Sequence, residues 1–302
     1  MRIGVSLRTA FVVDDVRVGA RWVVERAGAA RDAGLDSMLV GDHHATPVPY
    51  YQNTPLLGRL LAEWGDGPFG ALFLLPLWNP VLVAEQVGTL ASLAPGRFIL
   101  PLAVGERDQY APMGVHVDHR GRHFDAGLDV VRRLLAGETV TTHEPHHLRD
   151  AHVSPRPPDP VEVWIGGTAA GAVDRAARLG DGFLANADLT PDQARAVIDR
   201  YRERCAAHGR TPTAVAIRRD VHVGADPADA ERVAGPIVAA GYRGFDPSAC
   251  TYGSVEQVTE GLGTYADMGY TDVIVRHLAE DQSEVLASFA RLREVRAALS
   301  SA

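Results

Sequence analysis

Polar side chains follow four of the short apolar runs in this sequence, at the points where we expect strands to end. The segments are Gly41-Asp42-His43-His44, Gly105-Glu106-Arg107-Asp108, Gly166-Gly167-Thr168 and Arg276-His277. Histidine titrates near pH 6.5, so a histidine and a carboxylate that converge on one cavity can exchange protons at neutral pH. A lone strand-end histidine is often only a structural hydrogen-bonding residue. Four such strand ends together favour an acid–base site.

A small-residue turn, Ile165-Gly-Gly-Thr-Ala-Ala-Gly171, lies between a predicted strand and a predicted helix. Lys and Arg together number 30, and every one is arginine. The lack of lysine excludes Schiff-base chemistry, a P-loop lysine and covalent attachment of pyridoxal phosphate. A bound phosphate must therefore be held by arginine, hydroxyl groups or backbone N–H groups. We expect it at the N–H groups of Gly167, Thr168 or Ala169, although glycines that only make a tight turn would give the same pattern.

Twelve histidines raise the question of a metal site. His116, His119 and His123 are three and four residues apart, and Glu144, His146 and His147 form a second group. A catalytic metal needs three convergent ligands and an open position. His146 and His147 follow Pro145 in a loop, and no His-x-His pair ends the first strand as metal-dependent barrel hydrolases require. We therefore predict no metal, and keep such a hydrolase as an alternative.

Apolar strands alternate with amphipathic helices along the whole chain. The expected strands are residues 3–7, 37–41, 71–76, 97–104, 161–165, 181–185, 214–223 and 271–276, and the expected helices are 18–33, 81–93, 121–136, 169–179, 191–207 and 283–299. Eight strands with intervening helices predict a (β/α)8 TIM barrel, as one domain over residues 1–302, with insertions at its C-terminal face. The longest insertions are residues 42–70 and 224–270. A doubly wound sheet is the rival fold, but no glycine-rich fingerprint follows the first strand.

Composition limits the function further. The 302 residues carry a net charge of −8 and are 46% hydrophobic. An acidic chain is a poor general binder of nucleic acid, and no apolar run is long enough to span a membrane. The start of the chain has no secretory signal, and the two cysteines form no disulfide framework, so we expect a cytoplasmic protein.

Several short motifs, in this order and spacing, make the chain similar to the bacterial luciferase-like family of flavin- and F420-dependent oxidoreductases. They are Gly41-Asp-His-His44, Leu75-Pro-Leu-Trp-Asn-Pro-Val81, Glu85-Gln86, Thr89-Leu90, Gly96-Arg-Phe98, Gly114, Gly121-Arg-His-Phe-Asp125, Val163-Trp-Ile-Gly-Gly167, Ala176-Ala-Arg-Leu-Gly-Asp-Gly182 and Gly269. Each motif alone is weak, and the ordered set is specific. The chain departs from the pattern at Pro101 and Ala103, where glycines are usual, and in its lack of lysines.

The resemblance implies a TIM barrel that binds FMN or coenzyme F420 at the C-terminal ends of the strands. It implies a non-prolyl cis peptide in the third strand, at Leu72–Phe73, behind the cofactor ring. It also implies that Arg122 and the Gly167-Thr168-Ala169 loop hold the cofactor phosphate. We assign Gly105, Gly166 and Arg276 to the same cofactor-binding set.

The two cofactors imply different reactions. Reduced FMN supports monooxygenation of a small organic substrate with O2, whereas F420 carries hydride to or from a substrate. With either cofactor, we expect His43 to be the first proton donor or acceptor and Glu106 the second acid. Asp42 would fix the tautomer of His43 or face the cofactor. The insertion 45–69, with Tyr50, Tyr51, Gln52 and Trp64, is expected to roof the substrate pocket.

The resemblance also implies partners. Family members commonly form homodimers, and we expect one through the helix 81–93, which carries Val83, Val87, Leu90 and Ala91. A separate flavin or F420 reductase would supply the reduced cofactor, and the substrate would be a small molecule. Besides the metal-dependent hydrolase, a non-catalytic flavin-binding paralogue is an alternative; a mouth blocked by side chains would support it.

Overall fold

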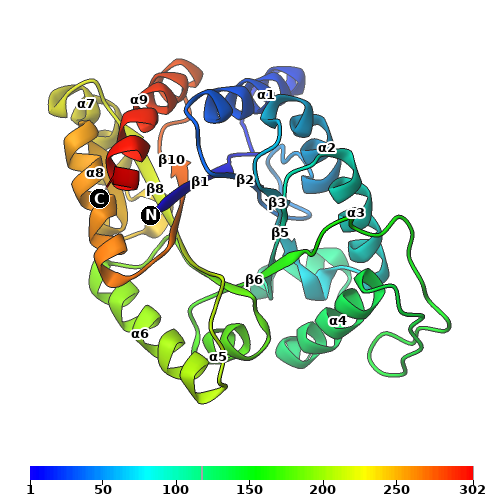
Figure 1. The fold of residues 1–302 in the computed structure, drawn as a ribbon. Coiled ribbons are helices and arrows are strands. Elements are labelled where there is room, and N and C mark those ends of the chain that lie inside the picture. The colour runs from blue at the N-terminus through cyan, green and yellow to red at the C-terminus, as the bar shows by residue number, and fades with distance from the viewer. Residues whose placement is uncertain (117, 302) are drawn as a thin grey trace.

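Eight parallel strands close into a barrel in the computed structural model, which describes residues 1–116 and 118–301. Their order is β1-β2-β3-β5-β6-β7-β8-β10, and β10 pairs with both β8 and β1, which closes the ring (Figure 1). The expected (β/α)8 barrel is confirmed. The strands are β1 (Arg2–Leu7), β2 (Ser37–Val40), β3 (Phe69–Ala71), β4 (Phe73–Leu74), β5 (Phe98–Ala103), β6 (Glu162–Gly166), β7 (Gly182–Ala185), β8 (Ala214–Val223), β9 (Cys250–Gly253) and β10 (Asp272–His277).

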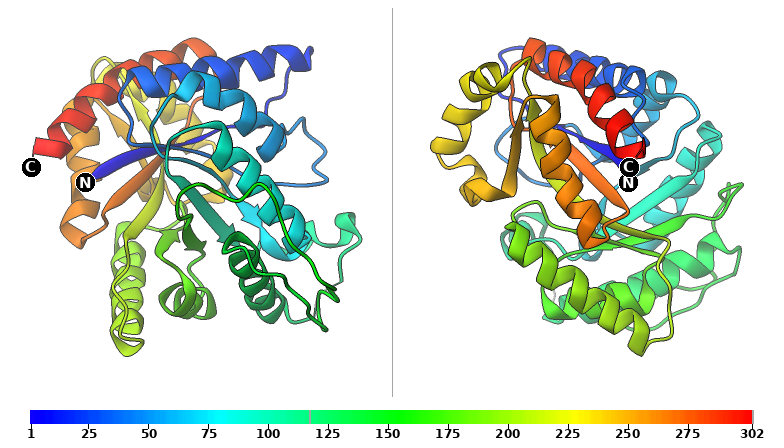
Figure 2. Two further views of the ribbon diagram at one scale, coloured as in Figure 1. Left: turned by 45° about the vertical axis from the view of Figure 1, so that its right-hand side comes forward. Right: turned by 60° about the vertical axis from the view of Figure 1, so that its left-hand side comes forward.

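Helices surround the barrel, and the two ends of the chain lie close together (Figure 2). The amino group of Met1 donates to the carbonyl of Leu299 at 3.3 Å. None of the helices in the described part of the chain is long and apolar enough to cross a membrane. The α-helices are α1 (Val16–Asp32), α2 (Asn53–Trp64), α3 (Pro80–Leu93), α4 (Arg120–Leu135), α5 (Ala170–Leu179), α6 (Pro191–Ala207), α7 (Pro227–Ala239), α8 (Val255–Met268) and α9 (Gln282–Ser301), with short 3-10 turns at 75–77, 107–109, 111–113, 242–244 and 247–249.

The two long insertions contain regular structure that the sequence analysis did not predict. Segment 42–70 contains α2, and segment 224–270 contains α7, β9 and α8. Trp64 ends α2, is 3% exposed, and donates its indole N–H to the carbonyls of Gly67 and Pro68. These carbonyls precede β3, at the opposite end of the barrel from the expected pocket. The expectation that Trp64 roofs the pocket is therefore wrong.

The third strand is interrupted at Leu72, where β3 ends and β4 begins. In the described residues the cis peptide bonds are Glu144–Pro145 and Ser154–Pro155, so the predicted cis bond at Leu72–Phe73 is wrong. Hydrogen bonds hold the interruption instead. Leu72 N donates to Val40 O at 2.9 Å, and the buried Asn53 donates its Nδ2 to Leu72 O at 2.7 Å. A trans bond, which is lower in energy by about 3–4 kcal/mol, is compatible with these contacts.

The side chains of the strands alternate between two apolar cores, as the period of two in a strand requires. One core fills the barrel interior, and the other lies between barrel and helices. Trp164 is fully buried in the interior, and a Cβ at Gly182 would lie 2.6 Å from its ring. The interior core consists of Leu39, Ile99, Trp164, Ala214, Ala216 and Ile274.

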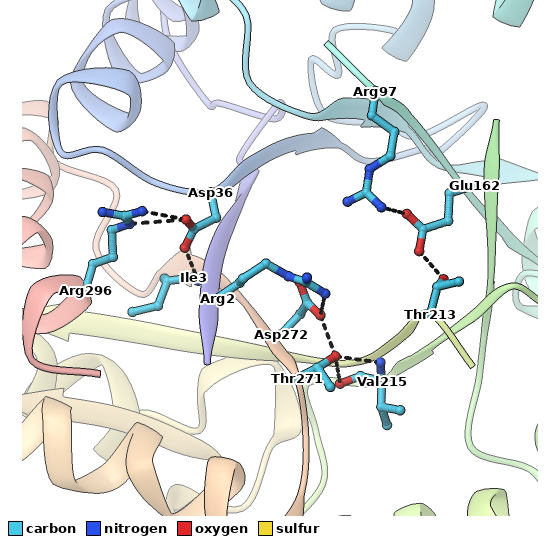
Figure 3. A network of polar contacts seen from close by, with 10 residues as sticks. All are labelled: Arg2, Ile3, Asp36, Arg97, Glu162, Thr213, Val215, Thr271, Asp272 and Arg296. Atoms are coloured by element: carbon cyan, nitrogen blue, oxygen red, sulfur yellow. Dashed lines mark hydrogen bonds and ion pairs between the residues drawn. The ribbon is translucent and has the colours of Figure 1, made fainter. Parts of the chain in front are cut away.

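Ion pairs gather where the strands begin (Figure 3). Arg2 makes two 2.7 Å hydrogen bonds to Asp272, and Arg296 makes a 2.7 Å contact with Asp36. Arg97 pairs with Glu162 at the same end. These pairs bind strand starts to one another and to α9. Charge pairs at this end of a barrel serve stability, since active sites of TIM barrels lie at the other end.

Candidate active site

A cavity of about 1270 Å³ lies at the C-terminal ends of the barrel strands. It brings together residues far apart in the sequence, as the strand-end pattern predicted. Of the twelve expected site residues, eleven line it: Asp42, His43, Leu72, Gly105, Glu106, Arg122, Gly166, Gly167, Thr168, Ala169 and Arg276. The exception is Phe73, which is fully buried with its ring 5.0 Å from that of Trp78 and does not line the cavity.

His43 is held by a residue that the sequence analysis missed. Gln109 Nε2 lies 2.5 Å from His43 Nδ1, and Gln109 Oε1 accepts a 2.9 Å hydrogen bond from Glu106 N. Because the amide oxygen of Gln109 accepts the bond from Glu106, the group that Gln109 turns toward His43 is its NH2 donor. His43 Nδ1 is therefore the acceptor, and the network assigns the ring proton to Nε2. Gln109 is 8% exposed, so packing also limits its movement.

Within the described residues the carboxylate of Asp42 makes no hydrogen bond to the ring of His43, which corrects the expectation that it fixes the tautomer of that ring. Its carboxylate is fully buried and accepts from Leu74 N and from Trp78 Nε1, both at 2.8 Å. The other oxygen lies 3.0 Å from His44 Nε2, and this contact raises the pKa of His44 although burial opposes it. Asp42 therefore anchors the interrupted third strand, and His44 is its partner.

Glu106 follows β5 and leaves its side chain exposed on the cavity wall. Gly105 before it has a φ of +79°, a left-handed conformation that favours glycine. The carbonyl of Gly105 accepts a 2.8 Å hydrogen bond from Arg120, whose guanidinium also lies over the ring of Tyr110. The turn after β5 thus has a fixed backbone and an exposed carboxylate, which forms a capping box with Gln109.

The predicted phosphate loop begins α5. Gly167 has a φ of +126°, and a Cβ there would lie 2.9 Å from Ala172. Its own N–H donates to Leu184 O at 3.2 Å, so it is not available to an anion and this part of the prediction is wrong. In the described chain, no backbone partner receives the N–H of Thr168 or Ala169. These two groups, at a helix N-terminus, remain suited to bind an anion.

The cavity is more positive than the chain as a whole. Acidic residues outnumber arginines 38 to 30 in the sequence. Around the cavity the order is reversed, and arginines outnumber carboxylates among the described residues. The arginines are Arg107, Arg120, Arg122, Arg175, Arg218, Arg243 and Arg276, and the carboxylates are Asp42, Glu106, Asp118 and Asp188. Such a cavity attracts anionic ligands.

The histidines weighed as metal ligands do not converge. The rings of His123 and His146 meet edge to face with centroids 4.6 Å apart, and His147 lies 3.0 Å from the exposed Glu144. No group of three or more His, Cys, Asp or Glu side chains suited to a metal ion occurs in the part of the chain described.

Besides Gln109, the sequence analysis missed Arg218 and Arg243 as residues of the site. Gln109 lies three residues after Glu106, the spacing at which a side chain returns to the N-terminus of its own turn. That spacing was the available signal. Arg218 lies within a strand, and Arg243 lies in the insertion 224–270, for which the sequence predicts no helix or strand, so neither residue had a local signal.

A parallel eight-stranded barrel with a polar cavity at the strand C-termini defines the class of protein. Residues 1–267 match the family described as luciferase-like monooxygenase. The chain belongs to this family, as its motifs indicated.

Relatives and solved structures within the family differ in cofactor. The chain is similar to F420-dependent glucose-6-phosphate dehydrogenases of Nakamurella multipartita (24% identical, over 94% of both chains) and Beutenbergia cavernae (28%, over 94% of this chain and 95% of the relative).

Its fold is similar to that of monooxygenase RslO1 from Streptomyces bottropensis (TM-score 0.84, 17% identical, 97% and 98% covered). It is also similar to an F420-dependent secondary alcohol dehydrogenase (0.78, 20%, 96% and 97%). A third similar fold is that of the oxygenating constituent of 3,6-diketocamphane monooxygenase from Pseudomonas putida, in complex with FMN (0.76, 17%, 96% and 96%). Relatives thus use F420 or FMN, and the metal-dependent hydrolase is not favoured.

Proposed function

We propose that the protein is an F420-dependent oxidoreductase that transfers hydride to or from a small organic substrate in the strand-end cavity. The excess of arginine around this cavity is the observation that carries the proposal. F420 bears a phosphodiester and several carboxylates, whereas FMN bears one phosphate, so a wall rich in arginine suits F420 better. The F420-dependent relatives align over almost their full length, which supports the same choice.

The residues present fit such a cofactor. Thr168 and Ala169 would bind its phosphate through their N–H groups at the start of α5, and Arg122 would add a guanidinium from the first turn of α4. Arg122 makes no hydrogen bond or ion pair within the described residues. Arg175 is instead committed to Asp125 at 2.5 Å and stacks on Phe124, so it supports the loop. Leu72 and Gly105 line the wall where the ring would lie.

Bound F420 would supply or accept hydride, and bound reduced FMN would supply electrons to O2. In either case the protein must move a proton. His43 presents Nε2–H to the cavity because Gln109 occupies Nδ1, so we assign to His43 Nε2–H a hydrogen bond to the substrate oxygen, which would hold that oxygen and stabilise negative charge on it. A neutral ring in this tautomer cannot take up a proton at Nε2, so we assign the proton transfer itself to Glu106, on the cavity wall.

Titration of the cofactor-free protein with F420 and with FMN, followed by absorbance and fluorescence, tests the proposal. We expect F420 to bind at least tenfold more tightly than FMN. Arg122→Met should weaken the binding of F420, and Arg133→Met, a change in the last turn of the same helix and outside the cavity lining, should not. Tighter binding of FMN would refute the F420 assignment and support a luciferase-like monooxygenase.

The non-catalytic alternative is less favoured, because the cavity at the strand ends has a volume of about 1270 Å³ and His43 and Glu106 both line it. A separate reductase that supplies reduced cofactor remains part of the proposal. So does a homodimer through α3. Val83, Val87, Leu90 and Ala91 are buried within the protomer itself, whereas Leu82 and Leu93 are 48% and 61% exposed and would form the contact. Light scattering at micromolar concentration, with Leu82→Glu as the disrupting variant, tests the dimer.

A further inference from the structure

Arg276 is a cation without a carboxylate partner on the cavity wall. It lies near the end of β10, and its Nε is buried with no hydrogen-bond partner within the described residues. No ion pair within those residues includes it. The nearby carboxylate of Asp220 is occupied, since it accepts from Arg218 Nε at 2.9 Å, from Arg218 Nη2 at 3.0 Å and from the Tyr242 hydroxyl at 2.7 Å.

Burial and two neighbouring positive charges disfavour the charged form of Arg276. Burial is the main cause that lowers the pKa of Arg276, to about 10, and the positive charges of Arg218 and Arg243 lower it further. Arg243 also lines the cavity, and its guanidinium lies 5.3 Å from the ring centroid of Phe245. Arg218 forms an ion pair with Asp220, whereas Arg276 and Arg243 form none within the described residues, and the negative charge of Asp220 only partly opposes the lowering of the Arg276 pKa. An uncompensated buried cation is costly, and a ligand anion would remove that cost.

This positive region is separate from the phosphate loop. Arg276 and Arg218 belong to β10 and β8, whereas the loop follows β6, and β7 lies between β6 and β8. Tyr50 links this region to His43. Burial raises the pKa of the Tyr50 hydroxyl, and the positive charge of Arg276 opposes this increase. The ring centroid of Tyr50 is 5.7 Å from that of His43. An anion at Arg276 would thus lie on the side of the cavity where His43 and Tyr50 meet.

We propose that Arg276, with Arg243, binds the anionic group of the substrate, a carboxylate or a phosphate, so that the substrates are small organic anions. This assignment rests on the proposed function and replaces our expectation that Arg276 binds the cofactor. Arginine suits the role because its planar guanidinium forms paired hydrogen bonds with either anion. The ion pair of Arg218 with Asp220 would serve as a fixed support behind the ligand.

Calorimetric titration of the cofactor-free protein with inorganic phosphate and with acetate, at low ionic strength, tests the proposal. We expect Arg276→Met to weaken one binding event at least tenfold for the preferred anion, and Arg122→Met to leave that event unchanged. The anion bound more tightly by wild type identifies the class of substrate. Unchanged binding of both anions by Arg276→Met would overturn the proposal.

Thermal unfolding separates ligand binding from a structural role. Replacing an unpartnered buried cation by methionine should raise the unfolding temperature of the free protein and abolish the further increase caused by the anion. A lowered unfolding temperature in both Arg276→Met and Arg276→Gln would show that the side chain is structural and would refute the assignment.

Cofactor titration of the same variant keeps the two proposals distinct. Arg276→Met should bind F420 with wild-type affinity. A tenfold loss of F420 affinity would return Arg276 to the cofactor and overturn the substrate assignment. Failure of wild type to bind F420 would refute the proposed function, while the anion titrations would still decide whether Arg276 binds an anion.

Discussion

Lowering the pH should destabilise this protein partly through one histidine, His277. Its side chain lies between the barrel and α9, with its ring centroid 4.3 Å from that of Phe289, and its Nε2 has no partner in the described chain. Burial, helped by the positive charge of Arg26, lowers the pKa of His277 to about 3. The ring is therefore neutral in the folded protein, whereas an unfolded histidine titrates near pH 6.5.

The sign of the effect follows from proton binding. Between pH 6.5 and pH 3 the unfolded state binds the proton and the folded state does not, so this stabilisation is complete above pH 6.5 and is lost as the pH falls. The slope approaches 1.4 kcal/mol per pH unit, and the loss between pH 7 and pH 4.5 is about 2.5 kcal/mol. The pKa of His222 is also lowered by burial and adds a loss of the same sign.

Urea unfolding at a series of pH values measures this contribution. His277→Leu should have a pH dependence shallower than wild type by about 1 kcal/mol per pH unit between pH 5.5 and 4. His152→Gln, which alters an exposed histidine, should follow wild type. Parallel curves for wild type and His277→Leu would show that the ring takes up its proton in the folded state, and would refute the reasoning.

Three further predictions concern the site and the barrel. His43→Ala should lower kcat about 10²–10⁴-fold with little change in cofactor affinity, and near-normal kcat with a lowered Tm would leave Glu106 as the acid. Gln109→Glu should move the His43 proton from Nε2 to Nδ1, because a carboxylate can only accept; unchanged ¹⁵N imidazole shifts would contradict the tautomer assignment. Gly70→Ala should cost about 3 kcal/mol or more in urea unfolding, since its Cβ would lie 1.8 Å from Ile99 O. Gly28→Ala, with nothing within 4 Å, should instead stabilise α1 by about 0.5–1 kcal/mol, and similar effects of both changes would disprove the packing argument.

Strand-end chemistry was predictable from sequence because the barrel places every strand C-terminus at one mouth. His43 and Glu106 needed only the correct number and direction of strands to be brought together. The contacts of Asp42 were not predictable in this way. Whether the carboxylate of Asp42 contacts His43 or His44 depends on the rotamers of these side chains. It also depends on Leu74, in β4, and on Trp78, after β4, which both donate to Asp42.

The missed helices had unequal signals. In α2, Leu56, Leu57, Leu60, Leu61 and Trp64 follow a helical period, but Gln52 gives no side-chain cap at its start. Helix α8 begins with Ser254 and Gln257, which form a capping box that the sequence displayed. Helix α7 contains Gly235 and Pro236, both poor helix formers, and packing overrides this local preference.

The two ends of the barrel differ in how completely their charges are paired. At the start of the strands, Asp272 is 6% exposed and Glu162 is 7% exposed, and each meets an arginine. At the opposite end, Arg122 and Arg276 face the cavity with no carboxylate partner within the described residues. A chain with more acidic than basic residues could have paired these arginines, as it pairs Arg2 and Arg97. Leaving Arg276 unpaired, with its Nε buried, costs stability, and a cavity that must hold an anion during a reaction is where that cost has a function.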